Sequence, residues 1–122
     1  MKFICSRPQL YEIVSNVSRA VSGKSSLAVL EGILIRAKRD KLTFLGYDLD
    51  LGIYAEMPAK VEEEGEIVLS ARLFVDMMRR MNGETVSIRT DDKYLTEIKS
   101  GLTEFTILGI PSDEFPEVPS VE

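Results

Sequence analysis

The chain has no histidine, no tryptophan and a single cysteine among its 122 residues. Without histidine it lacks the usual general base, the commonest zinc ligand and every Ser-His or Cys-His nucleophile pair. This absence argues against most hydrolase mechanisms. Cys5 has no partner for an internal disulfide, and its place in the first apolar run predicts a small buried side chain.

Long apolar runs and signal sequences are also absent. No run approaches the roughly 20 residues that a membrane-spanning helix needs, and the start MKFICSRPQL lacks the apolar region and cleavage site of a signal peptide. No glycine-rich segment has Walker or dinucleotide-binding spacing. With 44% hydrophobic and 29% charged residues, the chain is long enough for one compact domain over residues 1–122. We expect this domain to be cytoplasmic.

Positive charge is concentrated in two segments that also have helical periodicity. Residues 1–24 have a net charge of +3 and residues 70–82 a net charge of +2, so the total of −5 leaves −10 for the rest. The basic residues of these segments are Lys2, Arg7, Arg19, Lys24, Arg72, Arg79 and Arg80. Such a domain can face a polyanion with its helices while its remaining surface repels one. This pattern predicts a loose, one-sided contact with nucleic acid.

The first half of the chain predicts a strand, a helix and three strands. Lys2–Cys5 is short and apolar, and Ser6-x-x-Gln9 forms a candidate capping box at the start of a helix that ends at Ser22-Gly23. The apolar stripe of this helix consists of Leu10, Ile13, Val14, Val17 and Val21. Period-two alternation then predicts strands at Leu30–Lys38, Lys41–Tyr47 and Leu49–Met57, followed by an acidic loop at Glu62–Gly65.

The second half repeats this order of elements. Glu66–Leu69 predicts a strand, and Ser70 is the candidate N-cap of a helix that ends at Asn82-Gly83. Three further strands are predicted at Glu84–Arg89, Lys93–Lys99 and Leu102–Leu108. We expect an α+β fold in which two helices pack on one face of a curved, largely antiparallel sheet, built as two strand-helix-three-strand halves.

Charged side chains are the candidate functional groups. Asp48 and Asp50 lie two residues apart and could take a divalent cation, although solvated carboxylates fit a turn and an exposed strand better. The Glu62–Glu66 cluster fits a solvated loop, with partner binding as the alternative. The basic positions have no aromatic stacking platform and no helix dense enough in Arg, Asn and Gln to read a major groove. Any DNA contact should therefore be to phosphate, weak and independent of sequence.

Five stretches of the chain together resemble a known family. They are the start MKF, SLAVLEGILI at 26–35, FLGYDLDLGI at 44–53, GEIVLSARLFVDMMRRM at 65–81 and SGLTEFTILGIPSDEFPEVP at 100–119. In this order they resemble the amino-terminal domain of the bacterial sliding clamp, the beta subunit of DNA polymerase III. The resemblance covers essentially the whole chain, and its most specific parts are SAR before the second helix and the Gly-x-Pro-x-x-x-Phe-Pro tail.

The resemblance implies the DNA clamp fold and a replication processivity factor, with no catalysis and no cofactor. Clamps of this family form a ring-shaped homodimer with three such domains per chain, so we expect these residues to be one domain of a longer protein. Helices line the central hole, where duplex DNA passes through non-specific backbone contacts, and sheets form the outer wall. DNA polymerase and clamp loader would bind through domains absent here, and no membrane partner is implied.

The resemblance also assigns site residues. The family's basic DNA contact in the loop after the first helix falls on Lys24, the contact at the start of the second helix on Arg72, and a further lining residue on Arg79. Lys24 replaces an arginine, so it would act as a point charge without bidentate phosphate geometry. The apolar residues that pack across the subunit joint fall on Phe105 and Ile107 of the last strand.

Two functions from other classes remain open. The chain could be a structural protein-protein interaction module without DNA binding, whose sheet pairs with a partner through the edge at Leu102–Leu108. It could also be a metal-dependent hydrolase that uses Asp48, Asp50 and nearby glutamates. Charge reversal at the basic site residues separates a clamp from the first alternative, and a divalent-cation titration of the melting temperature tests the second.

Overall fold

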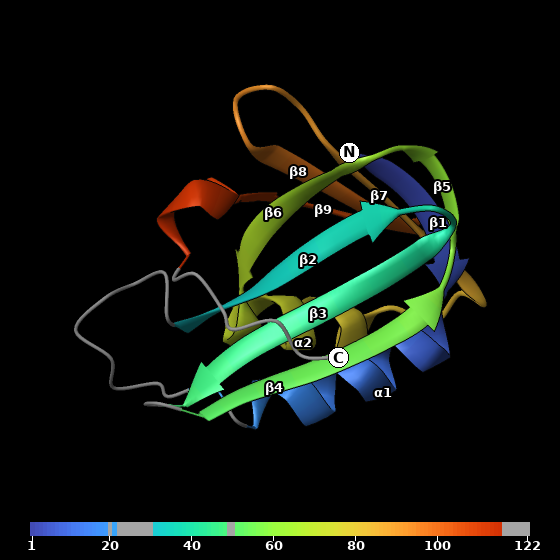
Figure 1. Cartoon of the computed structure of the whole chain (residues 1–122). Coiled ribbons are helices and arrows are strands. Elements are labelled where there is room, and N and C mark those ends of the chain that lie inside the picture. Colours follow the sequence, from blue (N-terminus) through green and yellow to red (C-terminus); the bar gives the residue numbers. More distant parts are fainter. Residues whose placement is uncertain (20, 22–30, 49–50, 116–122) are drawn as a thin grey trace.

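The structure is a computed structural model that describes residues 1–19, 21, 31–48 and 51–115. In these residues two α-helices pack against two antiparallel β-sheets (Figure 1), which confirms the predicted fold class. The five-stranded sheet has the order β5-β1-β7-β8-β9, and the four-stranded sheet the order β4-β3-β2-β6. The helices are α1 (Arg7–Ser18), α2 (Ala71–Arg80) and the short 3-10 helix η2 (Ser112–Glu114). The strands are β1 (Lys2–Ser6), β2 (Gly32–Lys38), β3 (Lys41–Asp48), β4 (Leu51–Pro58), β5 (Lys60–Glu63), β6 (Gly65–Ser70), β7 (Thr85–Thr90), β8 (Leu95–Ser100) and β9 (Thr103–Leu108).

Each half of the chain contributes its first strand to the sheet of the other half. β1 pairs antiparallel with β7, and β6 pairs antiparallel with β2. The β2-β3-β4 and β7-β8-β9 meanders complete the two sheets, and β5 adds an edge strand beside β1. The predicted repeat is therefore present as two interlocked halves that form two sheets.

The two helices begin at equivalent caps. Ser6 Oγ accepts a hydrogen bond from Gln9 N at 3.3 Å, and Ser70 Oγ accepts one from Leu73 N at 3.4 Å. Each cap satisfies a backbone N–H of the first turn that has no partner within the helix. The shift that relates the two serines also relates buried residues of the two helices, Leu10 to Phe74 and Val14 to Met78, and it relates Val17 to Met81, the buried C-cap residue of α2. The helices are thus equivalent elements of the repeat despite their different sequences.

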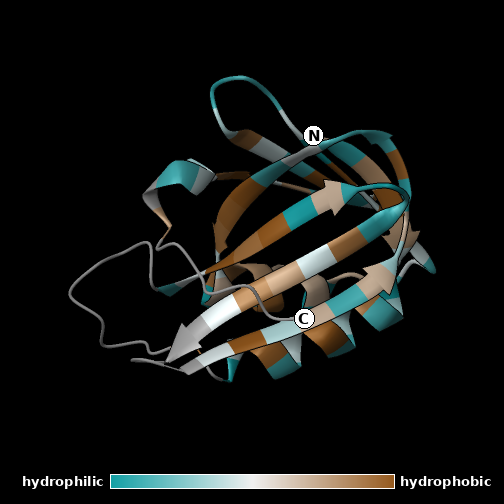
Figure 2. Cartoon of the chain, in the orientation of Figure 1, coloured by the Kyte–Doolittle hydropathy of each residue, from teal (hydrophilic) through white to brown (hydrophobic). Residues whose placement is uncertain are grey.

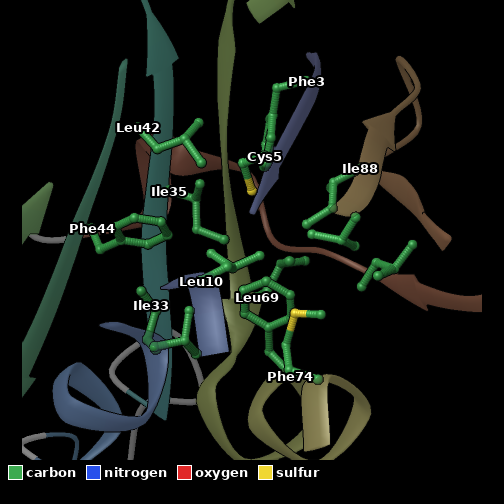
Figure 3. Close-up of a cluster of buried hydrophobic side chains, with 14 of the residues drawn as sticks. Phe3, Cys5, Leu10, Ile33, Ile35, Leu42, Phe44, Leu69, Phe74 and Ile88 are labelled. Carbon is green, nitrogen blue, oxygen red and sulfur yellow. The ribbon is translucent and has the colours of Figure 1, made fainter. Parts of the chain in front are cut away.

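One large apolar cluster holds the helices and both sheets together. Leu10 of α1, Phe74 of α2, Phe3 of β1 and Phe44 of β3 are all fully buried in it (Figure 3). Removing such a side chain from water stabilises the fold by roughly 1.5–3 kcal/mol. Cys5 lies in the same cluster, as predicted, and burial raises the pKa of its thiol to about 12. The thiol is therefore protonated at neutral pH.

The strands alternate between this core and the outer surface. On β2, Ile35 and Ala37 are buried and Arg36 between them is exposed, and Figure 2 shows the corresponding bands of hydrophobic and hydrophilic residues. A second, small cluster joins Leu34 and Val68 to the segment after β9. In that segment Ile110 exchanges two backbone hydrogen bonds with Val68, of 3.0 Å and 2.8 Å. The described residues after β9 are thereby fixed to the four-stranded sheet.

The first helix ends earlier than predicted. Helix α1 stops at Ser18, not at Ser22-Gly23, and the latter pair lies outside the described residues. The Ser18 hydroxyl donates a hydrogen bond to Ser15 O at 2.9 Å. Serine side chains that bond nearby backbone carbonyls compete with helix continuation, which fits a stop at this position. Val21 N then bonds Ser18 O at 3.1 Å.

The prediction of an acidic loop at Glu62–Gly65 was wrong in part, because strand β5 covers Lys60–Glu63. Val61 is paired with Phe3 of β1, while Lys60, Glu62 and Glu63 are exposed. A short edge strand with one inward residue has no period-two apolar pattern, so its sequence is indistinguishable from a charged loop.

Candidate nucleic-acid interface

A groove of about 450 Å³ lies between the helices and contains two of the predicted DNA contacts. Its lining from the first half is Ser18, Val21 and Glu31, and its lining from the second is Ser70, Ala71, Arg72, Val75 and Arg79. Arg72 and Arg79 lie two helical turns apart on α2, so they share one helix face. The structure therefore brings these two predicted cations together at one site, which we call the interhelical groove.

The cations of α2 differ in their partners. Asp76 Oδ1 accepts a hydrogen bond from Arg79 Nη2 at 2.8 Å, and Asp76 Oδ2 lies 3.1 Å from Arg80 Nη2. Arg72 is exposed, and no described carboxylate lies within ion-pair distance of it. Because Asp76 offsets part of the charge of Arg79 and Arg80, Arg72 is the cation of α2 most available to a phosphate. The neutralising role of Asp76 was not predicted, although its spacing to both arginines is visible in the sequence.

The other basic residues of the two helical segments differ in whether the structure describes them and in what they contact. Lys24 lies outside the described residues, so its position relative to the groove stays a prediction. Arg7 Nε donates to Gly83 O, and Arg7 N donates to Glu84 O at 3.0 Å, so Arg7 ties α1 to the chain after α2. Arg19 is exposed just after α1 and donates to Asn16 Oδ1 at 3.2 Å. Arg19 and Arg80 are thus exposed cations of the helix layer that were not assigned as contacts.

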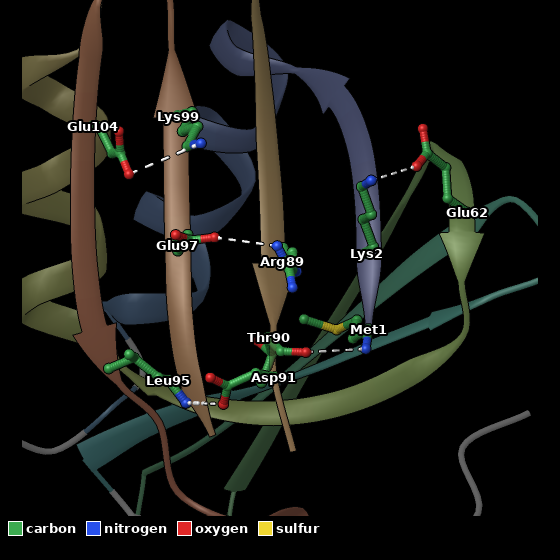
Figure 4. Close-up of polar contacts among 10 residues, drawn as sticks. All are labelled: Met1, Lys2, Glu62, Arg89, Thr90, Asp91, Leu95, Glu97, Lys99 and Glu104. Atoms are coloured by element: carbon green, nitrogen blue, oxygen red, sulfur yellow. Dashed lines mark hydrogen bonds and ion pairs between the residues drawn. The ribbon is translucent and has the colours of Figure 1, made fainter. Parts of the chain in front are cut away.

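Charges on the outer face of the five-stranded sheet are largely paired. Figure 4 shows three ion pairs: Lys2–Glu62 at 3.1 Å, Arg89–Glu97 at 3.7 Å and Lys99–Glu104 at 4.0 Å. The β7–β8 turn adds Asp91 and Asp92. The acidic chain therefore presents paired cations and extra carboxylates on this face, which does not favour a polyanion.

The four-stranded sheet carries a similar set of pairs. Arg36 Nε donates to Glu66 Oε2 at 2.6 Å, and Ser112 Oγ donates to Glu66 Oε1 at 2.8 Å. Partial burial raises the pKa of Glu66, but the bonds from Arg36 and Ser112 and the charge of Arg36 outweigh it and leave the pKa lowered. The hydrogen bond from Tyr54, together with Lys41, also lowers the pKa of Glu56. These carboxylates stay ionised at neutral pH.

The two residues predicted for a subunit joint face inward on β9. Ile107 is 8% exposed and belongs to the core, and Phe105 is half-buried and packs against it. Their neighbours Glu104, Thr106 and Leu108 are exposed on the other side of the strand. The joint role of Phe105 and Ile107 therefore remains a prediction, and the exposed apolar residues of this edge were not predicted as site residues.

The predicted alternative of a metal site receives no support. In the part of the chain that the structure describes, no group of three or more His, Cys, Asp or Glu is placed to hold a metal ion. Asp50 lies outside that part.

Within the described residues, neither helix is long and apolar enough to cross a membrane.

The comparisons with known proteins agree on one family. The family model described as "DNA polymerase III beta subunit, N-terminal domain" matches residues 1–119. The chain is 36% identical to the beta sliding clamp of Bacillus subtilis and 37% identical to that of Synechocystis sp., and each match covers all of this chain. The matches cover 34% and 33% of those relatives, so the chain spans about a third of their length.

Solved structures agree with this assignment. The crystal structure of the DNA polymerase sliding clamp from Bacillus subtilis superimposes with a TM-score of 0.95 at 36% identity, over 100% of this chain and 34% of that one. Sequence match and fold match thus extend over the same residues. The chain therefore belongs to the bacterial DNA polymerase III beta subunit family and corresponds to its N-terminal domain.

Proposed function

We propose that this domain is one arc of a ring-shaped sliding clamp, a replication processivity factor that encircles duplex DNA and tethers the replicative polymerase. Family membership supports this, because the relatives are named beta sliding clamps. In such a ring three domains of this kind follow one another in each of two chains. The domain acts by position and charge and catalyses no reaction. Its place of action is the cytoplasm, where the chromosome is replicated.

The interhelical groove is the surface that faces the DNA in this proposal. The observation that carries it is that Arg72 and Arg79 line one groove between the helices, with Arg72 free of a described carboxylate partner. Lys24 would extend this surface from the loop after α1. Two or three phosphate contacts per domain give weak, sequence-independent binding, so a closed ring can slide without being lost.

The other partners follow from the same proposal. A second clamp subunit would meet this domain at the β9 edge, with Phe105 and Ile107 packing behind the joint. Polymerase and clamp loader would bind the other domains of the ring. A protein-protein interaction module without DNA binding is the alternative function, and it predicts no role for the groove cations.

Charge reversal in the groove tests the proposal. Arg72→Glu/Arg79→Glu should lower the affinity of the chain for a short duplex at low salt by at least roughly tenfold, because two phosphate contacts become repulsive. The control is Lys60→Glu/Lys93→Glu, which changes the net charge equally at exposed positions of β5 and the β7–β8 turn. Fluorescence anisotropy with labelled duplex measures both.

An equal loss in the two variants would mean that only net charge matters. No loss in the groove variant would favour the interaction module. In a ring assembled from the full clamp chain, the same groove variant should dissociate sooner from circular DNA than the control.

A further inference from the structure

The connection between α2 and β7 contains Asn82, one of the chain's two asparagines, and a glycine follows it directly. Helix α2 ends at Arg80 and β7 begins at Thr85, so Asn82-Gly83 lies outside helix and strand. Asn82 is exposed, and among the described residues none is hydrogen-bonded to its side-chain amide. The reactive amide of Asn82 is therefore unrestrained and open to solvent.

An asparagine side chain can be attacked by the backbone nitrogen of the residue that follows it. Attack of Gly83 N on Asn82 Cγ forms a C–N bond and closes a succinimide ring. The attacking nitrogen gives up its proton, and the side-chain nitrogen leaves as ammonia. Water then opens the ring at either carbonyl, which gives aspartate or isoaspartate. The reaction needs a backbone nitrogen that is free of a hydrogen bond and is not shielded by a side chain.

Gly83 meets both requirements. Its backbone N donates no hydrogen bond to any residue that the structure describes, and a glycine has no side chain to shield it. Packing also prevents a larger residue here, because a Cβ at this position would clash with Ser100 Oγ and lie 3.2 Å from Gly101 N. The fold thus favours at this position the residue that leaves the nitrogen most accessible.

The other asparagine, Asn16, lacks these features. It lies within α1 and is followed by Val17, whose side chain is buried and whose backbone N–H belongs to the helical ladder. Asn16 Oδ1 also accepts a hydrogen bond from Arg19 Nη1 at 3.2 Å. Attack by the nitrogen of Val17 therefore requires local opening of the helix. Asn16 is an internal control for the reactivity of Asn82.

We propose that Asn82 is a site of spontaneous deamidation that lowers the positive charge of the helix layer. The new carboxylate follows Arg79 and Arg80 of the last turn of α2, where it offsets their charge and opposes the helix dipole. Isoaspartate also adds a methylene to the backbone beside Gly83, whose carbonyl oxygen accepts the hydrogen bond from Arg7 Nε. The conversion itself is independent of DNA, and only its effect on affinity rests on the proposed function.

Peptide mass spectrometry measures the conversion. The folded chain is incubated at physiological temperature and mildly alkaline pH, sampled over time and cleaved with trypsin, which releases residues 81–89 and 3–19. Peptide 81–89 should gain the mass difference between an amide and a carboxyl group and separate into two products of equal mass, one with aspartate and one with isoaspartate. Asn16 in peptide 3–19 should react at least roughly tenfold more slowly, because the helix must open first. Equal rates at the two asparagines, or an unchanged peptide 81–89, would overturn the proposal.

Asn82→Gln gives a matched chain for the effect on DNA binding. The exposed position tolerates the longer side chain, and glutamine closes its larger imide ring far more slowly. After equal incubation the parent chain should bind a short duplex roughly threefold more weakly at low salt than before, because one negative charge has been added beside the cations of α2. The Asn82→Gln chain should keep its affinity.

The outcomes separate the two proposals. An unchanged affinity of a parent chain that has been converted at Asn82 would contradict the effect on the charge of the helix layer. Failure of every chain to bind duplex DNA would contradict the proposed function alone, since peptide mass and isoelectric focusing report the conversion and its added charge without DNA.

Discussion

At the scale of residues, Asp76 controls how much positive charge the helices present. Its two oxygens hold Arg79 and Arg80 at 2.8 Å and 3.1 Å. We expect Asp76→Asn to raise the affinity for duplex DNA several-fold at low salt, because it removes one repulsive charge and frees two guanidinium groups. The cost to stability should stay below about 1 kcal/mol, as for exposed ion pairs. Anisotropy titrations measure the affinity.

The matched control for this change is Asp92→Asn, which removes the same charge from the exposed β7–β8 turn. It should raise affinity far less, since it lies on the sheet side of the molecule. Equal effects of the two substitutions would show that the affinity for DNA depends on net charge and not on where the negative charge is removed.

A second residue-scale prediction concerns Glu66 and acid. Its folded pKa is lowered, so its stabilising contribution is complete above the unfolded-state pKa of about 4.3 and is lost as the pH falls through the folded pKa. Glu66→Gln should therefore reduce the free energy of unfolding at pH 7, by no more than about 1 kcal/mol because the pair is partly exposed. Urea unfolding should show the difference shrinking below the folded pKa. A difference independent of pH would contradict this cause.

Arg72 and Arg79 of α2 were assigned from the family resemblance, and the structure places both in the lining of the interhelical groove. Their contact with DNA stays a prediction. Strand parity alone could have shown that Phe105 and Ile107 share a face with the core while Leu108 points outward. Lys24 could not be placed in this way, because it lies in a segment without periodicity.

At the scale of elements, the N-cap of α2 positions the groove. Ser70 Oγ accepts from Leu73 N, and Ser70 also lines the groove next to Arg72. Ser70→Ala should lower the free energy of unfolding by about 1 kcal/mol through loss of the cap. Ser70→Asp should retain most of the stability, because aspartate caps helices and suits the positive helix end. Chemical denaturation compares them, and equal losses in both variants would argue against a capping role.

Most elements were predictable because their apolar periods are strong. The ends of β3 and β7 and the start of α2 lie within two residues of their predicted positions, because their turns and cap are explicit in the sequence. The edge strand β5 and the end of α1 were not, since one depends on pairing with β1 and the other on a serine side chain bonding its own helix. Both are tertiary or local polar effects that hydrophobic periodicity does not report.

At the scale of the whole molecule, the exchange of first strands makes the two halves dependent on each other. β1 completes the sheet of the second half and β6 that of the first, and one apolar cluster spans both. The sequence showed the repeat but not this exchange, because strand order depends on non-local pairing. The interlocked halves hold α1 and α2 side by side, and that placement creates the groove.

The salt dependence of DNA binding tests the central claim most directly, namely that the groove cations contact DNA phosphates. Between about 50 and 200 mM salt, the logarithm of the binding constant should fall linearly with the logarithm of salt concentration. Arg72→Gln/Arg79→Gln should make that slope shallower by about 2, while Lys60→Gln/Lys93→Gln should leave it unchanged. The account is contradicted if the groove variant keeps both the slope and the affinity of the parent chain.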